Sequence, residues 1–540
     1  MISTTLAAAV TLGLVQPWFQ EEAARRGIDF KHDSGHRERH LFPECVCGGA
    51  ALFDADNDGD LDAYLVNAGP IEAEPGTRSP NRFYLNDGAG NFVDATDASA
   101  TGDRGYGMGV ACGDYDNDGF VDLYVTNLGA NVLYRNNGDA TFTDVTDAAG
   151  VGTAAWSSSA AFVDFDADGD LDLYVANYVN WSVATEITCF AANGENDYCS
   201  PKNYDAPAMD TLYRNNADAT FTDVTESAGL GVAFGNGLGV ICADFNADDR
   251  VDIFVANDGT PDQLWQNQGD ATFKDVGLET GVAIDFHGVP KAGMGVDAVD
   301  VDDDADIDLL VVNLANETDS FYRNEGAFFV DDTAIVGLGT RSRTFTRFGV
   351  AFADFDHDGY LDLFQSNGRV TKQSETYSDD PYAEPNIVMK GTPSGRFEER
   401  SPKGGTEQPL IAAGRGAAFG DVDNDGDVDI LIVNRDAPAH LLINVAEKHG
   451  NALQIRALDE HGRDAYGAAV FLNAGERPLR REIRATYSYC SSNDPRTHIG
   501  LGEADTATDV RVQWPDATVE SFPDLPAGAL HVLRKGEGNS

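Results

Sequence analysis

Seven acidic segments that share one nine-residue spacing are the part of this sequence most able to do chemistry. Four positions of each segment, the first, third, fifth and ninth, carry side-chain oxygens, and 27 of these 28 places are aspartate. Several carboxylates at alternating positions of a short loop, together with a main-chain carbonyl, form a ligand set that Ca²⁺ accepts, whereas Mg²⁺ demands stricter octahedral geometry. The spacing therefore predicts up to seven calcium sites.

The seventh position of each segment is chemically mixed, which is expected where only its backbone carbonyl binds the ion. The predicted ligands are Asp54, Asp56, Asp58, Asp60, Asp62, Asp114, Asp116, Asp118, Phe120, Asp122, Asp164, Asp166, Asp168, Asp170, Asp172, Asp244, Asn246, Asp248, Arg250, Asp252, Asp300, Asp302, Asp304, Asp306, Asp308, Asp354, Asp356, Asp358, Tyr360, Asp362, Asp421, Asp423, Asp425, Asp427 and Asp429.

The sixth position distinguishes two of the segments. It is glycine in five copies, where a left-handed turn then has no steric cost, but Asp249 and Ala305 stand there in the fourth and fifth copies. We expect these two sites to bind calcium more weakly. The twelfth position lacks the glutamate of a helix-loop-helix calcium hand, so the chain should leave each loop as a strand.

Strands must position these loops. The eighth position is always apolar, and short β-prone runs precede and follow every loop, which predicts a hairpin. A second hairpin follows each one, so each repeat supplies four strands and the seven repeats predict an all-β, seven-bladed propeller. The outer-strand pattern of Phe142 and Asp144 is absent after the seventh loop, but it recurs at Phe19 and Glu21. The N-terminal strand should therefore close the ring.

Charge and hydropathy bound the remaining possibilities. The formal net charge of -53 argues against nucleic acid or anionic lipid as a partner, because both are polyanions. No stretch reaches the length of a membrane span, although Ile2 to Val15 suits the apolar region of a signal peptide without a preceding basic residue. We predict a signal or N-terminal segment at 1–17, the propeller at 18–446 and a small β-sandwich-like domain at 447–540.

Several short segments between and beyond the acidic loops are distinctive. They are Pro43-Glu44, Trp156-Ser157-Ser158-Ser159, Cys199-Ser200-Pro201, Ala256-Asn257-Asp258-Gly259, Gly293-Met294-Gly295, Asn451 to Arg456, Gly467-Ala468-Ala469-Val470, His498-Ile499-Gly500-Leu501-Gly502 and Val512-Gln513-Trp514-Pro515. The acidic loops resemble the FG-GAP/VCBS repeats of secreted bacterial proteins and integrin α-subunits, and with these segments the sequence resembles more closely the cartilage acidic protein family. The segments from Asn451 onward are similar to an ASPIC/UnbV domain. The resemblance implies a secreted, extracellular or periplasmic calcium-binding protein that acts in adhesion through a protein or glycan ligand.

Catalysis is the alternative interpretation. Neither a Gly-x-Ser-x-Gly elbow nor a His-Glu-x-x-His motif is present, which favours binding over an enzyme. Two regions keep an extracellular enzyme or a transition-metal protein open. One is the segment that holds His32, His36, His40, Cys45 and Cys47, and the other is a central funnel, where the expected residues are His287, Lys291, Arg347, Asn257 and Asp258.

The remaining cysteines bear on the compartment. Cys189 and Cys199 lie in one polar insertion, where they would close a short loop if they are bridged. A disulfide at this place would imply an oxidising compartment.

Overall fold

A computed structural model describes residues 16–74 and 76–539 of the chain. Strands dominate it, and its helices are short. The helices are α1 (Thr96–Ser99), α2 (Thr146–Ala149) and α3 (Gly277–Thr280), with 3-10 turns at Phe42–Cys45, Val183–Thr185, Pro201–Asn203, Leu230–Val232, Ser342–Thr344 and Lys403–Gly405. Among the described residues, no helix has the length and apolar character needed to cross a membrane.

Most of the described strands before residue 445 form seven antiparallel four-stranded units. Their strands are β2 (Ala50–Phe53), β3 (Asp62–Leu65), β4 (Arg82–Asn86) and β5 (Phe92–Asp94); β6 (Gly107–Gly113), β7 (Asp122–Ala130), β8 (Val132–Asn136) and β9 (Phe142–Asp144); β10 (Ala154–Val163), β11 (Asp172–Asn177), β14 (Thr211–Asn215) and β15 (Phe221–Asp223); β16 (Gly237–Ala243), β17 (Asp252–Asn257), β18 (Gln263–Asn267) and β19 (Phe273–Asp275); β20 (Gly293–Val299), β21 (Asp308–Asn313), β22 (Ser320–Asn324) and β23 (Phe329–Asp331); β24 (Arg347–Ala353), β25 (Asp362–Asn367), β27 (Ile387–Gly391) and β28 (Phe397–Glu399); and β30 (Gly414–Gly420), β31 (Asp429–Asn434), β32 (His440–Asn444) and β1 (Phe19–Glu21).

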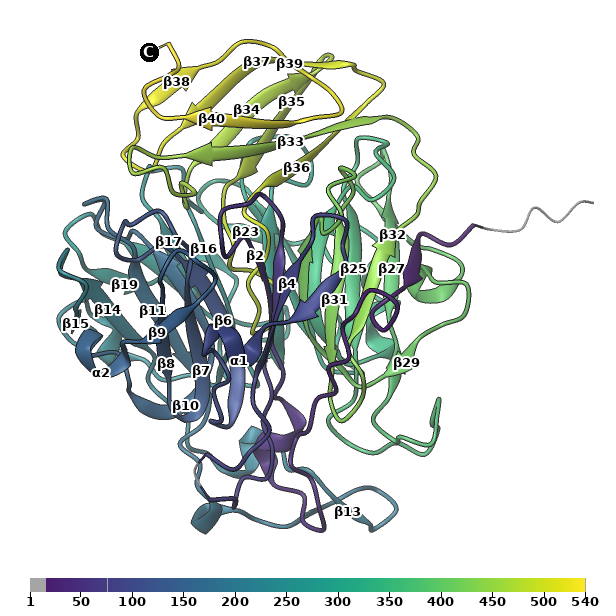
Figure 1. The fold of residues 1–540 in the computed structure, drawn as a ribbon. Coiled ribbons are helices and arrows are strands. Elements are labelled where there is room, and N and C mark those ends of the chain that lie inside the picture. The colour runs from purple at the N-terminus through teal and green to yellow at the C-terminus, as the bar shows by residue number, and fades with distance from the viewer. Residues whose placement is uncertain (1–15, 75, 540) are drawn as a thin grey trace, which may run out of the picture.

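The units close into a ring. The first strands β2, β6, β10, β16, β20, β24 and β30 contact one another in this order, and β30 contacts β2 again. In the last unit, β1 from the N-terminus pairs with β32, so that Phe19 lies opposite Asn444. The second and third units are joined into one sheet by a pairing between β7 and β10. This is an all-β, propeller-like arrangement (Figure 1).

The second strand of each unit is buried on both faces, which explains its composition. The strand Asp172–Asn177, with the sequence DLYVAN, is buried at every position. A strand covered on both faces tolerates a nearly continuous apolar run, since neighbouring units pack against both sides. The first residue of this strand is the ninth position of the acidic loop, and the apolar eighth position, such as Leu171, lies in the core between units. Packing therefore holds each loop rigidly at the edge of its unit.

Residues beyond 450 form a second β structure that lies across one end of the ring (Figure 1). It has a three-stranded and a five-stranded sheet around their own apolar core, which includes Trp514. The strands are β33 (Asn451–Leu458), β34 (Ala469–Ala474), β35 (Arg477–Glu482), β36 (Thr497–Gly502), β37 (Thr506–Gln513), β38 (Val519–Ser521), β39 (Leu525–Pro526) and β40 (Leu530–Arg534). We call residues 447–540 the C-terminal domain, and its boundary with the ring stays a prediction.

The centre of the ring is filled by two chain segments. The connection between β35 and β36, residues 483–496, enters from the C-terminal domain and bonds to the first strands: Val110 donates to the carbonyl of Cys490, and Val296 and Ser488 exchange backbone hydrogen bonds. Residues 42–48 fill the opposite part, where Cys45 and Cys47 join an apolar cluster with Tyr489 and Cys490. We name residues 483–496 the central plug.

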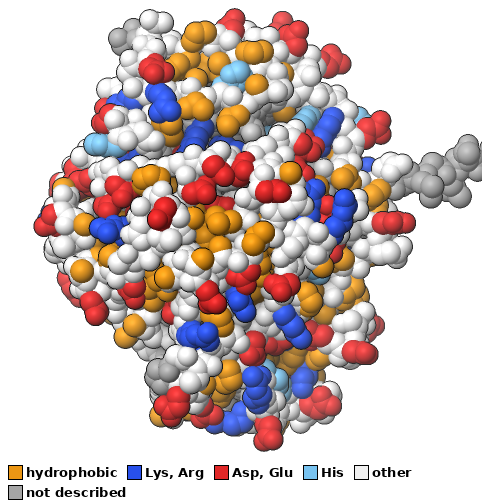
Figure 2. Space-filling model, viewed as in Figure 1, with side chains coloured by type: hydrophobic (Ala, Val, Ile, Leu, Met, Phe, Trp, Pro, Cys, Tyr) orange, Lys and Arg blue, Asp and Glu red, His pale blue; other side chains and the backbone are white. Residues whose placement is uncertain are grey.

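Two short strand pairs lie outside the units: β12 (Cys189–Phe190) with β13 (Asn196–Asp197), and β26 (Glu384–Pro385) with β29 (Ile411–Ala412). On the molecular surface, acidic side chains are spread over the visible face rather than gathered in a single patch (Figure 2). This distribution fits a solvated acidic surface for the charge outside the seven loops.

Candidate metal centres

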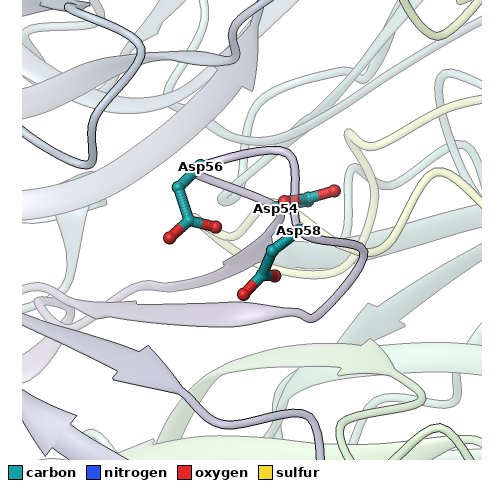
Figure 3. A group of neighbouring side chains, drawn as sticks. All are labelled: Asp54, Asp56 and Asp58. Carbon is teal, nitrogen blue, oxygen red and sulfur yellow. The ribbon is translucent and has the colours of Figure 1, made fainter.

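Each acidic loop connects the first two strands of its unit. In the first loop, the side chains of Asp54, Asp56 and Asp58 project from the turn between β2 and β3 (Figure 3). Each offers a carboxylate oxygen, and these oxygens lie within 4.8 Å of one another. Equivalent acidic groups occur in other loops: Asp114, Asp116 and Asp122; Asp164, Asp166 and Asp172; Asp300, Asp302 and Asp304; and Asp354, Asp356 and Asp362. The structure thus brings together predicted ligands from at least these five loops.

The sixth position is left-handed in every loop. Gly59 has φ 95° and Gly169 has φ 92°, while Asp249 and Ala305 adopt φ 66° and 73° despite their side chains. Their backbone N–H groups still bond to the first aspartate of the loop, as the glycine N–H groups do. The fourth and fifth loops therefore keep the turn, and they do so in a conformation that disfavours L-residues.

The ninth position has a structural role that the sequence pattern did not reveal. The carboxylate of Asp122 accepts the N–H of Tyr115 at 3.1 Å and the N–H of Asn136 at 2.7 Å, so it joins the loop to the third strand. Six other loops repeat the bond to the third strand. Burial raises the pKa of the equivalent Asp172 to about 9. The ninth aspartate is thus both a candidate ligand and an anchor of the loop.

The third position fits a cation best. One carboxylate oxygen of this residue is buried and has no hydrogen-bond partner in five loops, at Asp56, Asp116, Asp166, Asp356 and Asp423. The same holds for an oxygen of Asp54, whose pKa burial raises to about 6. A buried carboxylate oxygen without a donor is costly unless it binds a cation or is protonated. A hard divalent ion bound by these oxygens would satisfy them, and calcium matches the donor set.

Within the described residues, loops four and five do not have such an unpartnered oxygen at the third position. The fourth has Asn246 at the third position, and Arg250 contacts Asp248 within the same loop. In the fifth, Arg323 contacts Asp302. A guanidinium that pairs with a ligand carboxylate competes with a metal ion for it. The arginines therefore give a second physical reason to expect weaker calcium binding in loops four and five.

Basic side chains also approach three of the other loops. Lys390 lies 2.8 Å from Asp358 in loop six, and Arg26 lies 3.0 Å from Asp423 in loop seven. In the first loop, Arg456 is 3.7 Å from Asp54. Loops two and three hold the acidic groups with the least direct competition among the described ion pairs, so we expect them to bind calcium most tightly.

The C-terminal domain contacts the acidic loops directly. Arg463 donates to Asn117 of loop two at 2.6 Å and to the carbonyl of Gly169 in loop three at 2.5 Å. Arg477 bonds to Asp303 in loop five and to the carbonyl of Gly359 in loop six. Further contacts reach the other loops: Arg456 with Asp54, Gln513 with Asp249, and Arg496 with Asp421. The acidic loops thus form the platform on which this domain sits.

The histidine and cysteine segment does not converge on one point. Cys45 and Cys47 are fully buried in the apolar cluster at the centre of the ring, and burial raises the pKa of the Cys47 thiol to about 12. His36 instead lies 2.8 Å from Glu44, and the ring of His40 packs beside it at a tilt and meets the ring of Tyr198 edge-on. The thiols and imidazoles therefore have different surroundings, and the structure does not support a shared His/Cys metal site here.

The expected funnel residues are engaged elsewhere. Arg347 is fully buried and pairs with Asp319 at 2.6 Å. Tyr178 donates to Asp258 at 2.5 Å, and Lys291 donates to Thr318 at 3.0 Å. Because these contacts are internal and the central plug fills the ring, the prediction of a polar site in an open funnel is wrong for the described residues.

The disulfide between Cys189 and Cys199 is formed, with an S–S distance of 2.07 Å. It closes the loop of the β12–β13 hairpin, as the spacing of the two cysteines suggested. The five other cysteines are free thiols.

Comparisons with known proteins agree with this architecture. An FG-GAP-like repeat matches residues 54–125, 114–175, 244–311 and 300–364, each of which begins at the first aspartate of a loop, and an ASPIC and UnbV domain matches residues 459–540. Cartilage acidic protein 1 of Xenopus tropicalis is 28% identical over 282 residues, which cover 50% of this chain and 40% of that protein. Its Mus musculus counterpart is 28% identical over 308 residues, with 55% and 45% covered. The matched region thus spans less than half the length of these curated relatives.

One solved structure is that of an Agrocybe aegerita lectin with specific recognition of non-reducing terminal N-acetylglucosamine. It has a TM-score of 0.39 at 15% identity and covers 73% of this chain and 86% of that chain. The sequence matches carry the assignment: the chain is an FG-GAP repeat protein with a C-terminal ASPIC and UnbV domain, related to cartilage acidic protein 1.

Proposed function

We propose that this protein is an extracellular calcium-binding scaffold that binds a protein or glycan ligand. The observation that carries the calcium part is the buried, unpartnered carboxylate oxygen at the third position of five loops, as at Asp116 and Asp166. Such an oxygen recurs at one position of a repeated loop, and the same loop offers further carboxylates within 4.8 Å. A divalent ion with oxygen ligands satisfies all of them together.

Calcium would act on stability through the loops. Burial raises the pKa of the first aspartate, to about 6 at Asp114 and Asp164, because the charged form is poorly solvated there. An ion that binds only the folded loop stabilises the fold by about 1.4 kcal/mol per site when its concentration is about ten times the Kd. Several occupied loops would then contribute an amount comparable with the stability of a whole domain.

The disulfide supports the extracellular assignment. A bridge between Cys189 and Cys199 persists in an oxidising compartment and is rare in the cytosol. The apolar segment from Ile2 to Val15, which suggested a signal peptide, lies outside the described residues. The compartment therefore rests on the disulfide and on the resemblance to secreted repeat proteins.

The end of the ring away from the C-terminal domain offers a surface for a ligand. A hollow of about 490 Å³ is lined there by Arg78, Trp156, Asn180 and Trp181, among others. The indole N–H of the buried Trp156 has no acceptor within the described protein. Aromatic faces beside polar groups suit a sugar ring, whose apolar face stacks while its hydroxyls form hydrogen bonds.

Calorimetry tests the calcium proposal. Wild-type protein freed of metal should bind several Ca²⁺ ions and melt at a higher temperature when calcium is restored. Asp116→Asn, which removes one charge and keeps the shape, should lower the stoichiometry by one. Asp139→Asn changes an exposed hairpin-turn carboxylate and serves as the matched control. A melting temperature that chelation leaves unchanged would contradict the calcium proposal.

A glycan array on calcium-loaded protein tests the ligand proposal. Binding that is lost in Trp181→Ala and kept in Phe286→Ala, which changes an exposed aromatic residue that does not line the hollow, would locate the ligand in the hollow. Retention of all glycan binding by Trp181→Ala would place the ligand elsewhere.

A further inference from the structure

Two imidazoles from distant parts of the sequence meet beneath the C-terminal domain. His357 is the fourth residue of loop six, and His498 lies in β36 of the C-terminal domain. Their Nε2 atoms are 3.2 Å apart, and the Nε2 atom of His357 is 3.1 Å from Oδ1 of Asp427 in loop seven. The predicted calcium sites use neither the fourth side chain nor the side chain of the seventh position, so this group is free for another role.

Two other junctions between loops have an amide where loop six has His357. The fourth residue of loop two, Asn117, donates its amide hydrogen to Asp170 of loop three at 2.6 Å. Likewise, Asn424 of loop seven donates to Asp60 of loop one at 2.7 Å. In these two junctions an amide faces the carboxylate of the next loop, whereas loops three, four and five have Ala167, Ala247 and Asp303 at the fourth position. Loop six has an imidazole there, and β36 brings a second imidazole beside it.

Hydrogen bonding alone does not satisfy the three atoms. The Nε2 atom of His357 carries at most one hydrogen, yet it faces both Asp427 and the Nε2 atom of His498. If that hydrogen points to Asp427, the Nε2 atom of His498 has neither a donor nor an acceptor in His357; if it points to His498, the carboxylate oxygen has no donor there. The Nδ1 atom of His498 is also buried without a partner. Two imidazole nitrogens and a carboxylate oxygen thus converge with more lone pairs than hydrogens.

The two distances from the Nε2 atom of His357, 3.2 Å to His498 and 3.1 Å to Asp427, match those between neighbouring ligands of one metal ion. Bonds of about 2.0 to 2.1 Å in a tetrahedral zinc site place neighbouring ligand atoms about 3.3 Å apart. We propose that His357, His498 and Asp427 bind one divalent transition-metal ion of the zinc class, which joins loops six and seven to the C-terminal domain. Two imidazoles and one carboxylate favour such an ion over Ca²⁺, which prefers oxygen ligands.

The surroundings leave room for an ion to enter. His357 lines a pocket of about 560 Å³ between the ring and the C-terminal domain, so a water molecule or a small ligand can take the fourth position. Lys448 lies 2.7 Å from the second oxygen of Asp427 and holds this carboxylate in place while Oδ1 faces the imidazoles. A contact to the oxygen that does not face the metal orients a ligand carboxylate towards the metal.

Zinc titration in saturating calcium tests the proposal, because the acidic loops are then filled. Wild-type protein, previously freed of metals, should bind one Zn²⁺, and X-ray absorption of this complex should show imidazole scattering. His357→Asn introduces the side chain that bonds to the next loop in loops two and seven, so it should fold normally and bind zinc at least tenfold more weakly. His498→Gln should weaken binding similarly, whereas His461→Gln, at an exposed turn, should bind as the wild type does.

Two results would overturn the proposal. One is a wild-type protein that takes up no zinc at a stoichiometry near one, or whose zinc shows no imidazole ligands. The other is zinc affinity that stays unchanged in both His357→Asn and His498→Gln. The wild-type measurement needs no variant, so a folding defect in His498→Gln would not leave the question open.

Discussion

Tyr489 donates its hydroxyl hydrogen to the carbonyl of Val46 at 2.6 Å, so two segments separated by more than 400 residues meet inside the ring. Tyr489 belongs to the central plug, whereas Val46 follows the first 3-10 turn of the chain. Both are buried. The contact means that the C-terminal domain contributes to the core of the ring and does not merely cover one end of it.

Truncation of this tyrosine should destabilise the ring. Tyr489→Ala removes a fully buried aromatic ring and should lower the free energy of unfolding by about 3 to 5 kcal/mol. Tyr489→Phe loses only the hydroxyl and leaves the carbonyl of Val46 unpaired, at a cost of about 1 to 3 kcal/mol. Urea unfolding in saturating calcium measures both. Equal stability of Tyr489→Ala and wild type would mean that the plug does not fill the ring in solution.

The left-handed turns predict opposite effects for two reciprocal substitutions. Gly169 has φ 92° and nothing within 4 Å of an added Cβ, so Gly169→Ala should destabilise by about 1 to 2 kcal/mol through backbone strain alone. Ala305 already has φ 73°, and Ala305→Gly should stabilise by about 0.5 to 1 kcal/mol. Chemical unfolding of both variants checks the signs, and two changes of the same sign would refute this explanation.

The acidic loops should differ in affinity because arginine competes in some of them. Arg323 contacts Asp302 of loop five, so Arg323→Gln should release that carboxylate and strengthen calcium binding by this loop by up to about tenfold. Calcium titration of the variant detects the change in the weakest class of sites. Arg341→Gln alters an exposed arginine and should have no effect. If the weakest calcium sites have the same affinity in Arg323→Gln as in the wild type, the arginine does not compete with calcium.

The packing of the C-terminal domain on the ring should depend on one arginine that bonds to two loops. Arg463 bonds to Asn117, to the carbonyl of Gly169 and to Asp459 while it is largely buried. Arg463→Ala leaves these partners without a donor and should cost about 3 kcal/mol. Limited proteolysis between the ring and the domain should become faster. Arg511→Ala, which removes an exposed arginine of the same domain, is the control and should be cleaved at the wild-type rate.

Much of the fold followed from one local pattern. The acidic spacing, the apolar eighth position and the second hairpin predicted four strands per repeat, and the pattern at Phe19 and Glu21 predicted the strand that pairs with β32. These features are readable because each is a pattern of residues close in sequence, even where the strand partner, as for Phe19 and Asn444, lies far along the chain. The same pattern identified the oxygens at Asp116 and Asp166 that remain without partners.

The contacts between the ring and its C-terminal domain were not readable in this way. Nothing local marks Tyr489 as a plug residue, because its partner Val46 is distant in the chain. Three arginines on one strand, Arg477, Arg480 and Arg481, do indicate a surface that contacts acidic residues. The identity of those acidic residues depends on how the C-terminal domain packs on the ring. The role of His498 likewise appears only when β36 is placed beside loop six.

A buried histidine gives the fold an acid-sensitive element distinct from the calcium loops. Burial lowers the pKa of His32 to about 4, while the same group in the unfolded chain has a pKa near 6.5. The charges of Asp436 and Asp33 oppose this shift, and those of Arg435 and Arg415 add to it. Between pH 6.5 and 4, the unfolded chain therefore binds a proton that folded His32 does not, so the stability contribution of His32 is present above pH 6.5 and lost as the pH falls towards 4.

His32→Gln, which keeps a neutral polar side chain, should reduce the acid-induced loss of stability. The measurement is the free energy of unfolding at several pH values between 7 and 4 in saturating calcium, compared between wild type and variant, so that changes in the acidic loops cancel. His461→Gln removes an exposed histidine and should keep the wild-type slope. Parallel curves for His32→Gln and wild type would show that His32 is protonated as readily in the folded protein as in the unfolded chain, because burial would then leave its proton affinity unchanged.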